Sequence, residues 1–405
     1  MFAAEVNPLG IKSAEVVVCI PSYNEAPNIA LPTQKADEGL CEYFQGTKAV
    51  IINCDNDSTD GTREVFLKTG TEVPKIYLST PPGVRGRGNN LKNLFKKVLD
   101  LKAEVVIVVD ADLKSITAQW IKRLGEPLTR DFGYVAPLYV RHKYDGTITN
   151  AIAYPMTRAL YGRRVRQPLG GDFGFSGRLA EIYLRSNTWD EAVSQFGIDI
   201  WMTILAMNNG IPICQAFMGR PKIHKAKDPV TELGPMFRQV IGTIFKMMIK
   251  SAPFWKGVKW SKPTAIFGFG LGEVEMPPTV EVNFHLLHHR FVEGFDDHLE
   301  LWRKVFCGEV LRKLMEIRDL DNDRFDFPTL VWIRVLYDMA VVFQKTPPEN
   351  TNALIDSLIP LYVGKTLSFA KKTERMSTQE AEEVIENEST LFEESKPYLV
   401  ENWPG

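Results

Sequence analysis

The stretch from Val105 to Asp112, VVIVVDAD, decides the fold, because five β-branched apolar residues run directly into a pair of aspartates. A continuous apolar run of this length suits a strand that is covered on both faces, as in a parallel sheet. Two earlier runs, Val16 to Ile20 and Ala49 to Cys54, have the same character and the same polar endings. The three runs therefore predict buried strands of one parallel sheet.

Segments that follow the apolar runs or lie between them have the 3.6-residue spacing of helices. They cover about residues 27–45, 60–69 and 88–101. Alternating strands and helices predict βαβ units, and such sheets bind ligands at the carboxyl ends of their strands. We therefore expect an α/β fold in which the polar residues after each apolar run carry the chemistry. These residues are Pro21-Ser22-Tyr23-Asn24-Glu25, Asp55-Asn56-Asp57-Ser58-Thr59-Asp60 and Asp110-Ala111-Asp112.

The overall composition is that of a globular protein. With 405 residues, 44% of them hydrophobic and 24% charged, the chain exceeds the usual size of a single core. We therefore expect one main domain and a sizeable additional region. A formal net charge of −2 argues against a protein that binds nucleic acid through a generally basic surface.

Cysteine usage and the N-terminus bear on the cellular compartment. The five cysteines have no CxxC spacing, and Cys19 and Cys54 lie in apolar runs, which indicates buried thiols in a reducing compartment. The N-terminus lacks the pattern of a secretory signal, and no uninterrupted apolar run reaches transmembrane length. The sequence therefore predicts a cytoplasmic protein without a transmembrane segment.

Longer amphipathic helices replace the βαβ pattern from about residue 236. The apolar face of the first one carries Phe237, Val240, Ile241, Ile244 and Met248. Helical spacing returns at about residues 295–317, 328–344 and 351–372. We therefore expect a catalytic domain over residues 1–235 and a mainly helical region over residues 236–405, which packs on the catalytic domain or at a subunit interface.

Charge is unevenly distributed in the helical region. The stretch Leu233–Gly272 contains six basic residues and no acidic one, together with several aromatic residues. A packed helix with a solvated basic face is the favoured interpretation, and a membrane-surface role for residues 236–262 is left open. The acidic and polar tail after Ser377 predicts a surface helix or a partly disordered segment.

The pair Asp110 and Asp112 is the sharpest local signal for chemistry. Residues two apart on an extended chain point to the same side, so both carboxylates can face one ligand. Such a pair can hold a hard divalent cation against a diphosphate, and Mg²⁺ or Mn²⁺ suits these oxygen ligands. An Asp-x-Asp pair by itself is common in turns. Its place directly after a predicted buried strand favours the metal interpretation.

The segment Gly83-Val84-Arg85-Gly86-Arg87-Gly88 leads into a predicted helix. Glycines permit close backbone approach, a helix start presents free N–H groups to anions, and arginines add charge-assisted hydrogen bonds. The segment lacks the Gly-Lys-Ser/Thr ending of a P-loop, and a flexible loop is the alternative. With acidic strand ends predicted nearby, phosphate binding is the favoured interpretation.

The segment that begins at Asp55 admits two roles. Its carboxylates could accept hydrogen bonds from a base N–H or from ribose hydroxyls, whereas Ser58 or Asp60 could cap the following helix. We expect Asp55 to lie nearer the ligand and Asp60 nearer the helix cap.

Together, the three strand-end motifs resemble the nucleotide-sugar domain of glycosyltransferases of the GT-A fold, which is Rossmann-like. Further similarity extends to Gln167-Pro168-Leu169-Gly170-Gly171-Asp172, Phe196-Gly197-Ile198-Asp199, His224 and Glu232-Leu233-Gly234. These motifs are similar to the family of glucosyl-3-phosphoglycerate synthase and mannosylglycerate synthase, which are retaining enzymes. The likeness covers about residues 15–250, and the Gln-Pro-Leu-Gly-Gly motif is its most specific part.

The resemblance implies a role for each motif. The implied donor-binding residues are Pro21, Tyr23, Glu25, Asp55, Gly86, Arg87, Asp110 and Ala111, with Asp55 at the base and Asp110 at the ribose. The implied cation ligands are Asp112 and His224. Gly170 and Gly171 would form the backbone floor under the sugar, with Asp172 and Asp199 as acidic residues of the catalytic site. Thr149 and Arg141 would hold the acceptor.

The implied activity is a retaining transfer of a hexose from GDP-mannose or UDP-glucose to a small acceptor, with Mg²⁺ or Mn²⁺ as cofactor. The cation and the arginines would stabilise the charge that grows on the departing diphosphate. In a retaining reaction the acceptor hydroxyl approaches on the leaving-group face and the departing phosphate oxygen takes its proton. An inverting reaction would need a carboxylate base, for which Asp172 is the candidate.

Several positions depart from the family pattern. Asp172 replaces a glutamate, Phe196 replaces a larger polar aromatic residue, and Arg87 replaces a lysine, so the sugar and the nucleobase stay open. Thr147 and Ala226 stand where glucosyl-3-phosphoglycerate synthases have an arginine and an asparagine for the acceptor phosphate. Loss of these donors predicts a non-phosphorylated acceptor such as glycerate.

Other functions compete with this interpretation. An inverting transferase that acts on a lipid phosphate or a saccharide remains open, as does an inactive protein that binds nucleotide sugars. A nucleotidyltransferase is disfavoured because Pro21-Ser22-Tyr23-Asn24-Glu25 contains no glycine-rich loop. The expected partners are a nucleotide-sugar donor and a small hydroxylated acceptor, without nucleic acid, and a homodimer is left open.

Overall fold

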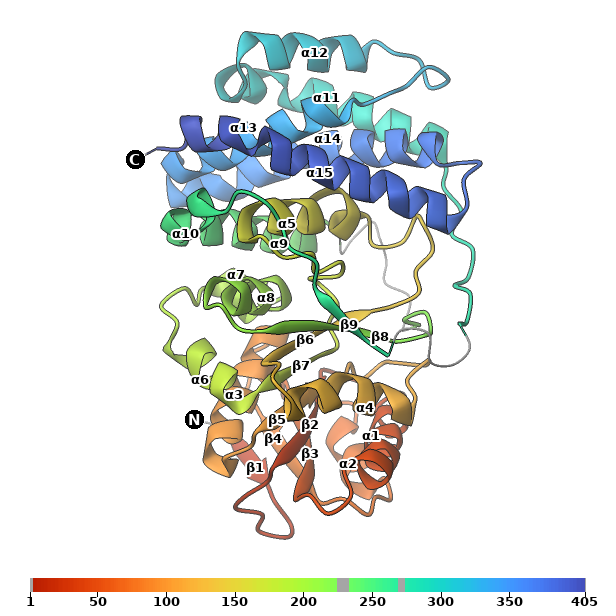
Figure 1. Cartoon of the computed structure of the whole chain (residues 1–405), viewed down its shortest axis with the longest axis vertical. Coiled ribbons are helices and arrows are strands. Elements are labelled where there is room, and N and C mark those ends of the chain that lie inside the picture. The colour runs from red at the N-terminus through yellow and green to blue at the C-terminus, as the bar shows by residue number, and fades with distance from the viewer. Residues whose placement is uncertain (1–2, 224–232, 269–273, 405) are drawn as a thin grey trace. The chain divides into compact units, whose positions relative to one another are not determined.

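A computed structural model describes residues 3–223, 233–268 and 274–404 of the chain. The chain forms two compact units, a sheet unit and a helical unit (Figure 1). The sheet unit comprises Met1–Arg141, Val165–Lys227 and Thr264–Pro277, and the helical unit comprises His142–Arg164, Asp228–Pro263 and Pro278–Gly405. This division differs from the single boundary expected at residue 235, because each unit is built from three separate stretches of the chain.

The sheet unit contains a mixed sheet with the strand order β1-β4-β3-β2-β5-β7-β6-β8-β9. Strands β2, β3, β4 and β5 are parallel, whereas β7 runs antiparallel to both of its neighbours. The strands are β1 Ala4–Val6, β2 Val16–Ser22, β3 Ala49–Asp55, β4 Lys75–Ser79, β5 Val105–Val108, β6 Tyr134–Leu138, β7 Phe173–Ser176, β8 Ile213–Phe217 and β9 Ala265–Phe267. The α/β class expected from the apolar runs is therefore confirmed.

Helices connect the strands of the sheet unit. They are α1 Ala30–Tyr43, α2 Thr62–Lys68, α3 Arg87–Leu101, α4 Ala118–Gly125, α6 Gly177–Arg185, α7 Glu191–Ser194, α8 Ile198–Asn208 and the 3₁₀ turn Glu126–Thr129. All residues of β2 are buried, as are Trp120 and Ile121 of α4. Burial on both faces explains why the central strands read as continuous apolar runs instead of alternating patterns.

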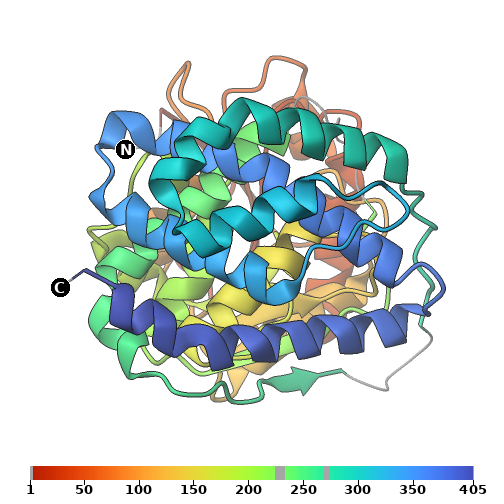
Figure 2. The same cartoon turned by 90° about the horizontal axis from the view of Figure 1, so that it is seen from above.

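The helical unit confirms the mainly helical character of the C-terminal region. It contains the π-helical turn Thr149–Ala153, α5 Tyr154–Tyr161, α9 Leu233–Lys250, α10 Ala252–Gly257, α11 Phe284–Val305, α12 Gly308–Arg318, α13 Thr329–Lys345, the 3₁₀ turn Pro348–Asn350, α14 Thr351–Lys372 and α15 Thr378–Asn402. Figure 2 shows this unit from above, with α15 in dark blue. The face of α9 that carries Phe237 and Ile244 is buried, as its spacing predicted.

Two details of the helical unit differ from the sequence-based expectation. The helix expected over residues 295–317 is two helices, because Phe306 and Cys307 adopt extended backbone conformations between α11 and α12. The tail after Ser377 forms α15, whose start is fixed by a capping box between Ser377 and Glu380. The alternative of a partly disordered segment is therefore wrong for the residues of α15.

Segment 142–164 belongs to the helical unit because α5 packs on α15. Arg158 of α5 forms ion pairs with Glu386 and Glu393 of α15. Arg158 and Glu393 are 3% and 4% exposed at their side chains, so this contact is buried. We refer to Arg158, Glu386 and Glu393 as the Arg158 network.

Among the described residues, one helical stretch, Pro348–Lys372, is long and apolar enough to cross a membrane. Within its most apolar window, 72% is buried inside the protein, which is typical of a core helix. The described cysteines are all free thiols, with Cys19, Cys54 and Cys214 buried, as the absence of CxxC spacing indicated.

Candidate active site

The carboxyl ends of β2 and β3 lie side by side, as the sequence predicted. Ser22 and Asp55 are register partners at the ends of these two strands. The backbone N–H of Asn56 donates to the Ser22 carbonyl at 3.0 Å, and the side-chain amide of Asn90 in α3 donates to the same oxygen at 3.1 Å. The start of α3 is therefore tied to both strand ends.

The carboxylate of Asp55 is buried and engaged by the chain itself. It accepts hydrogen bonds from the hydroxyls of Ser22, Ser58 and Tyr77 at 2.6, 2.6 and 3.0 Å, and from the Ser58 backbone N–H at 2.7 Å. These four donors match the roughly four acceptor sites of a carboxylate. In this arrangement Asp55 holds the loop after β3 in place, and its role at the nucleotide base stays a prediction.

Other predicted donor residues lie around the same loop. Pro21 is buried in β2, whereas the ring of Tyr23 is 37% exposed and lies 4.6 Å from the guanidinium carbon of Arg85. The Glu25 carboxylate accepts a hydrogen bond from the Asn28 amide at 2.7 Å. Asp60 accepts from the N–H of Thr62, the first residue of α2, at 3.0 Å, which agrees with its expected place at the helix start.

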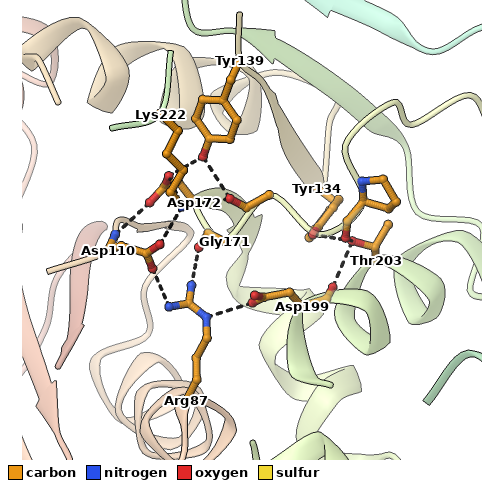
Figure 3. Close-up of polar contacts among 11 residues, drawn as sticks. Arg87, Asp110, Tyr134, Tyr139, Gly171, Asp172, Asp199, Thr203 and Lys222 are labelled. Carbon is orange, nitrogen blue, oxygen red and sulfur yellow. Dashed lines mark hydrogen bonds and ion pairs between the residues drawn. The ribbon is translucent and has the colours of Figure 1, made fainter. Parts of the chain in front are cut away.

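Arg87, the first residue of α3, makes three contacts with its guanidinium group (Figure 3). Nη1 donates to the Asp110 carboxylate at 2.5 Å, and Nε donates to the Asp199 carboxylate at 3.0 Å. Nη2 donates to the backbone carbonyl of Gly171. Arg87 thus joins α3 to the end of β5, to α8 and to the glycine pair expected under the sugar.

Lys222, which follows β8, lies on the other side of Asp110 (Figure 3). Its Nζ is 2.6 Å from Asp110 and 2.9 Å from Asp172, and it donates to the Gly170 carbonyl at 3.0 Å. The sequence alone gives Lys222 no role. Its position two residues before His224, a predicted cation ligand, is the one indication that it lies near the site. We refer to Arg87, Asp110, Asp172, Asp199 and Lys222 as the sheet-edge cluster.

The carboxylate of Asp172 is fully buried within this cluster. It accepts hydrogen bonds from the Asp110 backbone N–H at 2.8 Å and from the Tyr139 hydroxyl. Tyr139 therefore also belongs to the site, and no local sequence pattern indicated it. With Lys222 as a third partner, both oxygens of Asp172 are occupied.

Asp199 lies at the start of α8 and completes the set of acids. The backbone carbonyl of Asp199 accepts from the Thr203 hydroxyl at 3.1 Å, and Thr203 also pairs with the Tyr134 hydroxyl at 2.8 Å. These contacts fix the first turn of α8 against β6 (Figure 3). The side chain of Asp199 is thereby directed at Arg87.

The acids of the sheet-edge cluster have different electrostatic surroundings. Burial raises the pKa of Asp110, but the nearby charges of Arg87 and Lys222 outweigh it, so the pKa of Asp110 lies well below its usual value. For Asp172 and Asp199 burial prevails over the cationic partners, and their pKa values are raised. Three carboxylates and two cations share the site, and Asp110 is the acid most firmly held as an anion.

The glycines Gly86 and Gly88 are required by close packing of the chain on itself, which the sequence did not reveal. A Cβ on Gly88 would lie 1.9 Å from the Val193 carbonyl oxygen, and one on Gly86 would lie 2.3 Å from that of Ser194. The Gly88 N–H also donates to the Gln195 carbonyl at 3.2 Å. The close backbone approach that these glycines permit is therefore an approach to α7 and the residue after it.

The glycine pair Gly170 and Gly171 lies against the sheet-edge cluster. A Cβ on Gly170 would lie 2.0 Å from the Pro137 side chain. Gly171 has a φ of +80°, and a Cβ there would lie 2.8 Å from Nζ of Lys222 and 3.1 Å from the Asp110 carboxylate. The bare backbone at this point lets the carbonyls of both glycines contact the cations of the cluster.

The predicted cation ligands are only partly described. Ala111 is buried and Asp112 is partly exposed, and both follow β5. His224 lies outside the described residues. No group of three His, Cys, Asp or Glu side chains suited to a metal occurs within residues 3–223, 233–268 and 274–404. Mg²⁺ needs few protein ligands when substrate phosphates complete its shell, so Asp112 fits a site that it shares with other donors.

The two predicted acceptor residues belong to different units. Arg141 in the sheet unit lies with its guanidinium carbon 5.5 Å from the Tyr139 ring centre. Its Nε is buried and has no hydrogen-bond partner among the described residues. Thr149 begins the π-helical turn of the helical unit and is 5% exposed.

Comparison with known proteins gives the family. The family model for the mannosylglycerate synthase GT domain matches residues 12–245. Mannosylglycerate synthase from Rhodothermus marinus is 24% identical over 214 residues, which cover 48% of this chain and 52% of the relative. Glucosyl-3-phosphoglycerate synthase from Mycolicibacterium smegmatis is 26% identical over 255 residues, which cover 56% of this chain and 76% of the relative.

A solved structure also matches part of the chain. It is glucosyl-3-phosphoglycerate synthase from Mycobacterium tuberculosis in complex with Mn²⁺, UDP and glucosyl-3-phosphoglycerate, at 24% identity and a TM-score of 0.46. The match covers 58% of this chain and 80% of that one. The chain spans about half the length of the mannosylglycerate synthases that it matches, 52% in each case. The family match extends over more than half of the 405 residues, and the chain therefore belongs to the family of the mannosylglycerate synthase glycosyltransferase domain.

Proposed function

We propose that the chain is a retaining hexosyltransferase that moves a hexose from GDP-mannose or UDP-glucose to a small acceptor such as glycerate. The observation that carries the proposal is the sheet-edge cluster, in which two cations, 14% and 9% exposed at their side chains, and three carboxylates meet at the carboxyl edge of the sheet. Ligands of open α/β sheets bind at this edge. Membership in a glycosyltransferase family supplies the class of reaction.

Arg87 is suited to stabilise the departing diphosphate. Its guanidinium group has five N–H donors, and three contacts to the chain leave two for ligand oxygens. Carboxylates fix the group in place before substrate arrives, so little reorganisation is needed when charge develops. Arg87 thereby combines a fixed orientation with free donors.

The cofactor that we propose is Mg²⁺ or Mn²⁺, held by Asp112 and His224 with diphosphate oxygens. The bound cation would act as a Lewis acid on the diphosphate. The Asp110 carboxylate is engaged by both Arg87 and Lys222, and the family resemblance assigns the cation to Asp112. The solved glucosyl-3-phosphoglycerate synthase from Mycobacterium tuberculosis holds Mn²⁺ together with UDP.

Retention of the anomeric configuration is supported by the state of Asp172. An inverting reaction needs a carboxylate that can take the acceptor proton, and Asp172 was the candidate. Its two oxygens face the Asp110 N–H, the Tyr139 hydroxyl and Lys222, and the side chain is fully buried. This arrangement favours Asp172 as a residue that positions Lys222 and Asp110, which leaves the proton to the departing phosphate.

The acceptor that we propose carries a carboxylate and no phosphate. Arg141 presents a buried Nε without a hydrogen-bond partner among the described residues, which suits a carboxylate. The Thr147 hydroxyl is paired with the Tyr362 hydroxyl, so this position offers no charged donor for phosphate. The assignment of Thr149 to the acceptor stays a prediction.

One assay tests the donor, the metal and the acceptor. The full-length protein is incubated with GDP-mannose or UDP-glucose and with D-glycerate or 3-phosphoglycerate at equal concentrations, with Mn²⁺ or with EDTA. We expect Mn²⁺-dependent transfer to D-glycerate and an anomeric coupling in the NMR spectrum that matches the donor. A clear preference for 3-phosphoglycerate would overturn the acceptor assignment, and an inverted product would overturn retention.

The variant Asp112→Ala tests the cation site. We expect it to abolish Mn²⁺-dependent turnover, because the diphosphate charge then loses its fixed counter-ion. The exposed Asp131→Ala, in the same unit, serves as the matched control and should keep wild-type activity. Full activity of Asp112→Ala in EDTA would remove the cation from the proposal.

A further inference from the structure

Asp110 and Asp172 are held side by side by the backbone of the sheet unit. The backbone N–H of Asp110 donates to Oδ1 of Asp172 at 2.8 Å, so the two carboxylates separate only if this hydrogen bond is lost. The side chain of Asp172 is fully buried, and that of Asp110 is 20% exposed. Two neighbouring carboxylates that are largely shielded from water are costly as a pair of anions unless a cation lies between them.

The ammonium group of Lys222 lies between the two carboxylates (Figure 3). Its Nζ is 2.6 Å from Oδ2 of Asp110 and 2.9 Å from Oδ2 of Asp172, and it donates to the Gly170 carbonyl at 3.0 Å. An ammonium group has three N–H donors, and these three oxygens account for all of them. Lys222 therefore has no donor left for a substrate oxygen, in contrast to Arg87.

The chain also fixes the position of Lys222. The next residue, Ile223, donates its N–H to the Ser115 hydroxyl at 2.9 Å, and its carbonyl accepts from the Lys114 N–H at 2.8 Å. Both partners belong to the segment between β5 and α4. Because the Lys222 side chain is also only 9% exposed, its ammonium group is in place before any ligand arrives.

Three oxygen atoms around one positive charge are also the surroundings of a hard metal ion. Mg²⁺ and Mn²⁺ bind carboxylate and carbonyl oxygens, and one or two carboxylates with further oxygen ligands suffice. Asp110, Asp172 and the Gly170 carbonyl supply such a set. Without Lys222, the three carboxylates of the sheet-edge cluster would face Arg87 alone, and one divalent ion would supply the missing two positive charges.

We infer that Lys222 is a built-in counter-ion, whose ammonium group occupies the place that a divalent metal ion would otherwise take between Asp110 and Asp172. The ammonium group holds both aspartates and the Gly170 carbonyl in position without a metal ion. Lys222 is thus a positioning residue of the sheet-edge cluster. The inference concerns this one place, and it depends neither on the cation proposed at Asp112 nor on the transfer reaction.

Counting bound Mn²⁺ ions tests the inference. Full-length wild type and Lys222→Ala are titrated with Mn²⁺ to about 1 mM, the upper limit for weak oxygen-ligand sites, and free Mn²⁺ is measured by its EPR signal. We expect Lys222→Ala to bind one Mn²⁺ per chain more than wild type, because truncation leaves both carboxylates and opens space for the ion and its water ligands. Mn²⁺ should also raise the Tm of the variant by more than that of wild type. Equal numbers of bound ions in the two proteins overturn the inference.

A second variant covers the case in which Lys222→Ala does not fold. Lys222→Gln fills most of the space of the lysine, and its amide oxygen can serve as a further metal ligand. It should also bind one Mn²⁺ more than wild type. Adding Asp172→Asn to the variant that folds removes one of the two carboxylates, so the additional ion should be lost. An additional ion that survives Asp172→Asn would lie elsewhere and would overturn the inference.

Lys75→Ala is the matched control. Nζ of Lys75 also donates to three oxygens of the chain, but all are backbone carbonyls, those of Phe66, Leu67 and Thr69. Loss of a purely structural lysine should lower the Tm without additional Mn²⁺ binding, and a gain equal to that of Lys222→Ala would contradict the role of the carboxylate pair. Wild type that binds no Mn²⁺ would count against the cation of the proposed function, whereas the difference between variant and wild type tests Lys222.

Discussion

The sheet-edge cluster and the Arg158 network each hold an arginine between two acids, yet they differ in what surrounds them. Arg158 links two helices, and its partners Glu386 and Glu393 both come from α15. Arg87 links the ends of separate elements, and its partners come from the segment after β5, from α8 and from a glycine backbone. The first arrangement stabilises packing between helices. The second gathers charge at the edge where α/β sheets bind ligands.

The difference teaches how to distinguish a structural ion pair from a functional one. Glu393 also accepts hydrogen bonds from the backbone N–H and the hydroxyl of Ser261, so the Arg158 network is closed by its own unit. The sheet-edge cluster instead keeps two acids with raised pKa values beside two cations. Perturbed pKa values beside fixed cations are typical of functional sites.

The largest expected effect comes from Arg158→Met. It should lower the free energy of unfolding by about 3–5 kcal/mol, because Glu393 stays buried without its charged partner. Urea denaturation measures this loss, and turnover per folded molecule should stay near wild type. If turnover per folded molecule also fell strongly in Arg158→Met, Arg158 would act in the reaction as well as in folding, and the distinction between the two regions would fail.

Arg87→Met should lower turnover by about 10²–10³-fold, because fixed positive charge is lost where the leaving group develops negative charge. The measurement is kcat for the donor and acceptor identified by the transfer assay. Arg87→Lys separates charge from shape, since a lysine cannot reproduce three directed contacts at once, and it should recover only part of the activity. Turnover near wild type in Arg87→Met would remove the cluster from the reaction.

Gly88→Ala should destabilise the sheet unit by about 1–3 kcal/mol, because the new methyl group would overlap the Val193 carbonyl. The change also displaces the neighbouring Arg87, so kcat should fall with stability. Gly70→Ala is the control, since no atom lies within 4 Å of its added Cβ, and unfolding should change by less than about 0.5 kcal/mol. If Gly88→Ala left the free energy of unfolding unchanged, the loop would be able to move away from Val193 at little cost.

The smallest expected effect concerns Lys396 of α15, whose pKa burial lowers to about 8. A lysine with a lowered pKa in the folded state destabilises folding most where it is charged, so its penalty is full below pH 8. The penalty then fades as the pH rises toward the unfolded value of about 10.4. Between pH 8 and about 10.4 the free energy of unfolding of wild type should rise by about 1–2 kcal/mol relative to that of Lys396→Met, after allowance for solvent screening. If urea denaturation gave the same pH dependence of the free energy of unfolding for wild type and Lys396→Met, the prediction would be wrong.

Some of the fold and the site followed directly from the sequence. Strands β2, β3 and β5 were predictable because full burial makes them continuous apolar runs, and their polar endings had to meet at one edge. Contacts that depend on distant parts of the chain could not be predicted. Lys222 is 112 residues from Asp110, and no local pattern links them. The same holds for Tyr139 and Asp172 and for the fit of Gly88 to α7.

The pairing of α5 with α15 has a consequence for synthesis of the chain. Arg158 and Glu393 are 235 residues apart, so α5 leaves the ribosome long before its partner exists. At typical elongation rates of about 5–20 residues per second, the wait lasts roughly 10–50 s. During that time Arg158 lacks the two glutamates with which it pairs in the folded protein. The buried ion pair between α5 and α15 can therefore close only after Glu393 has been synthesised.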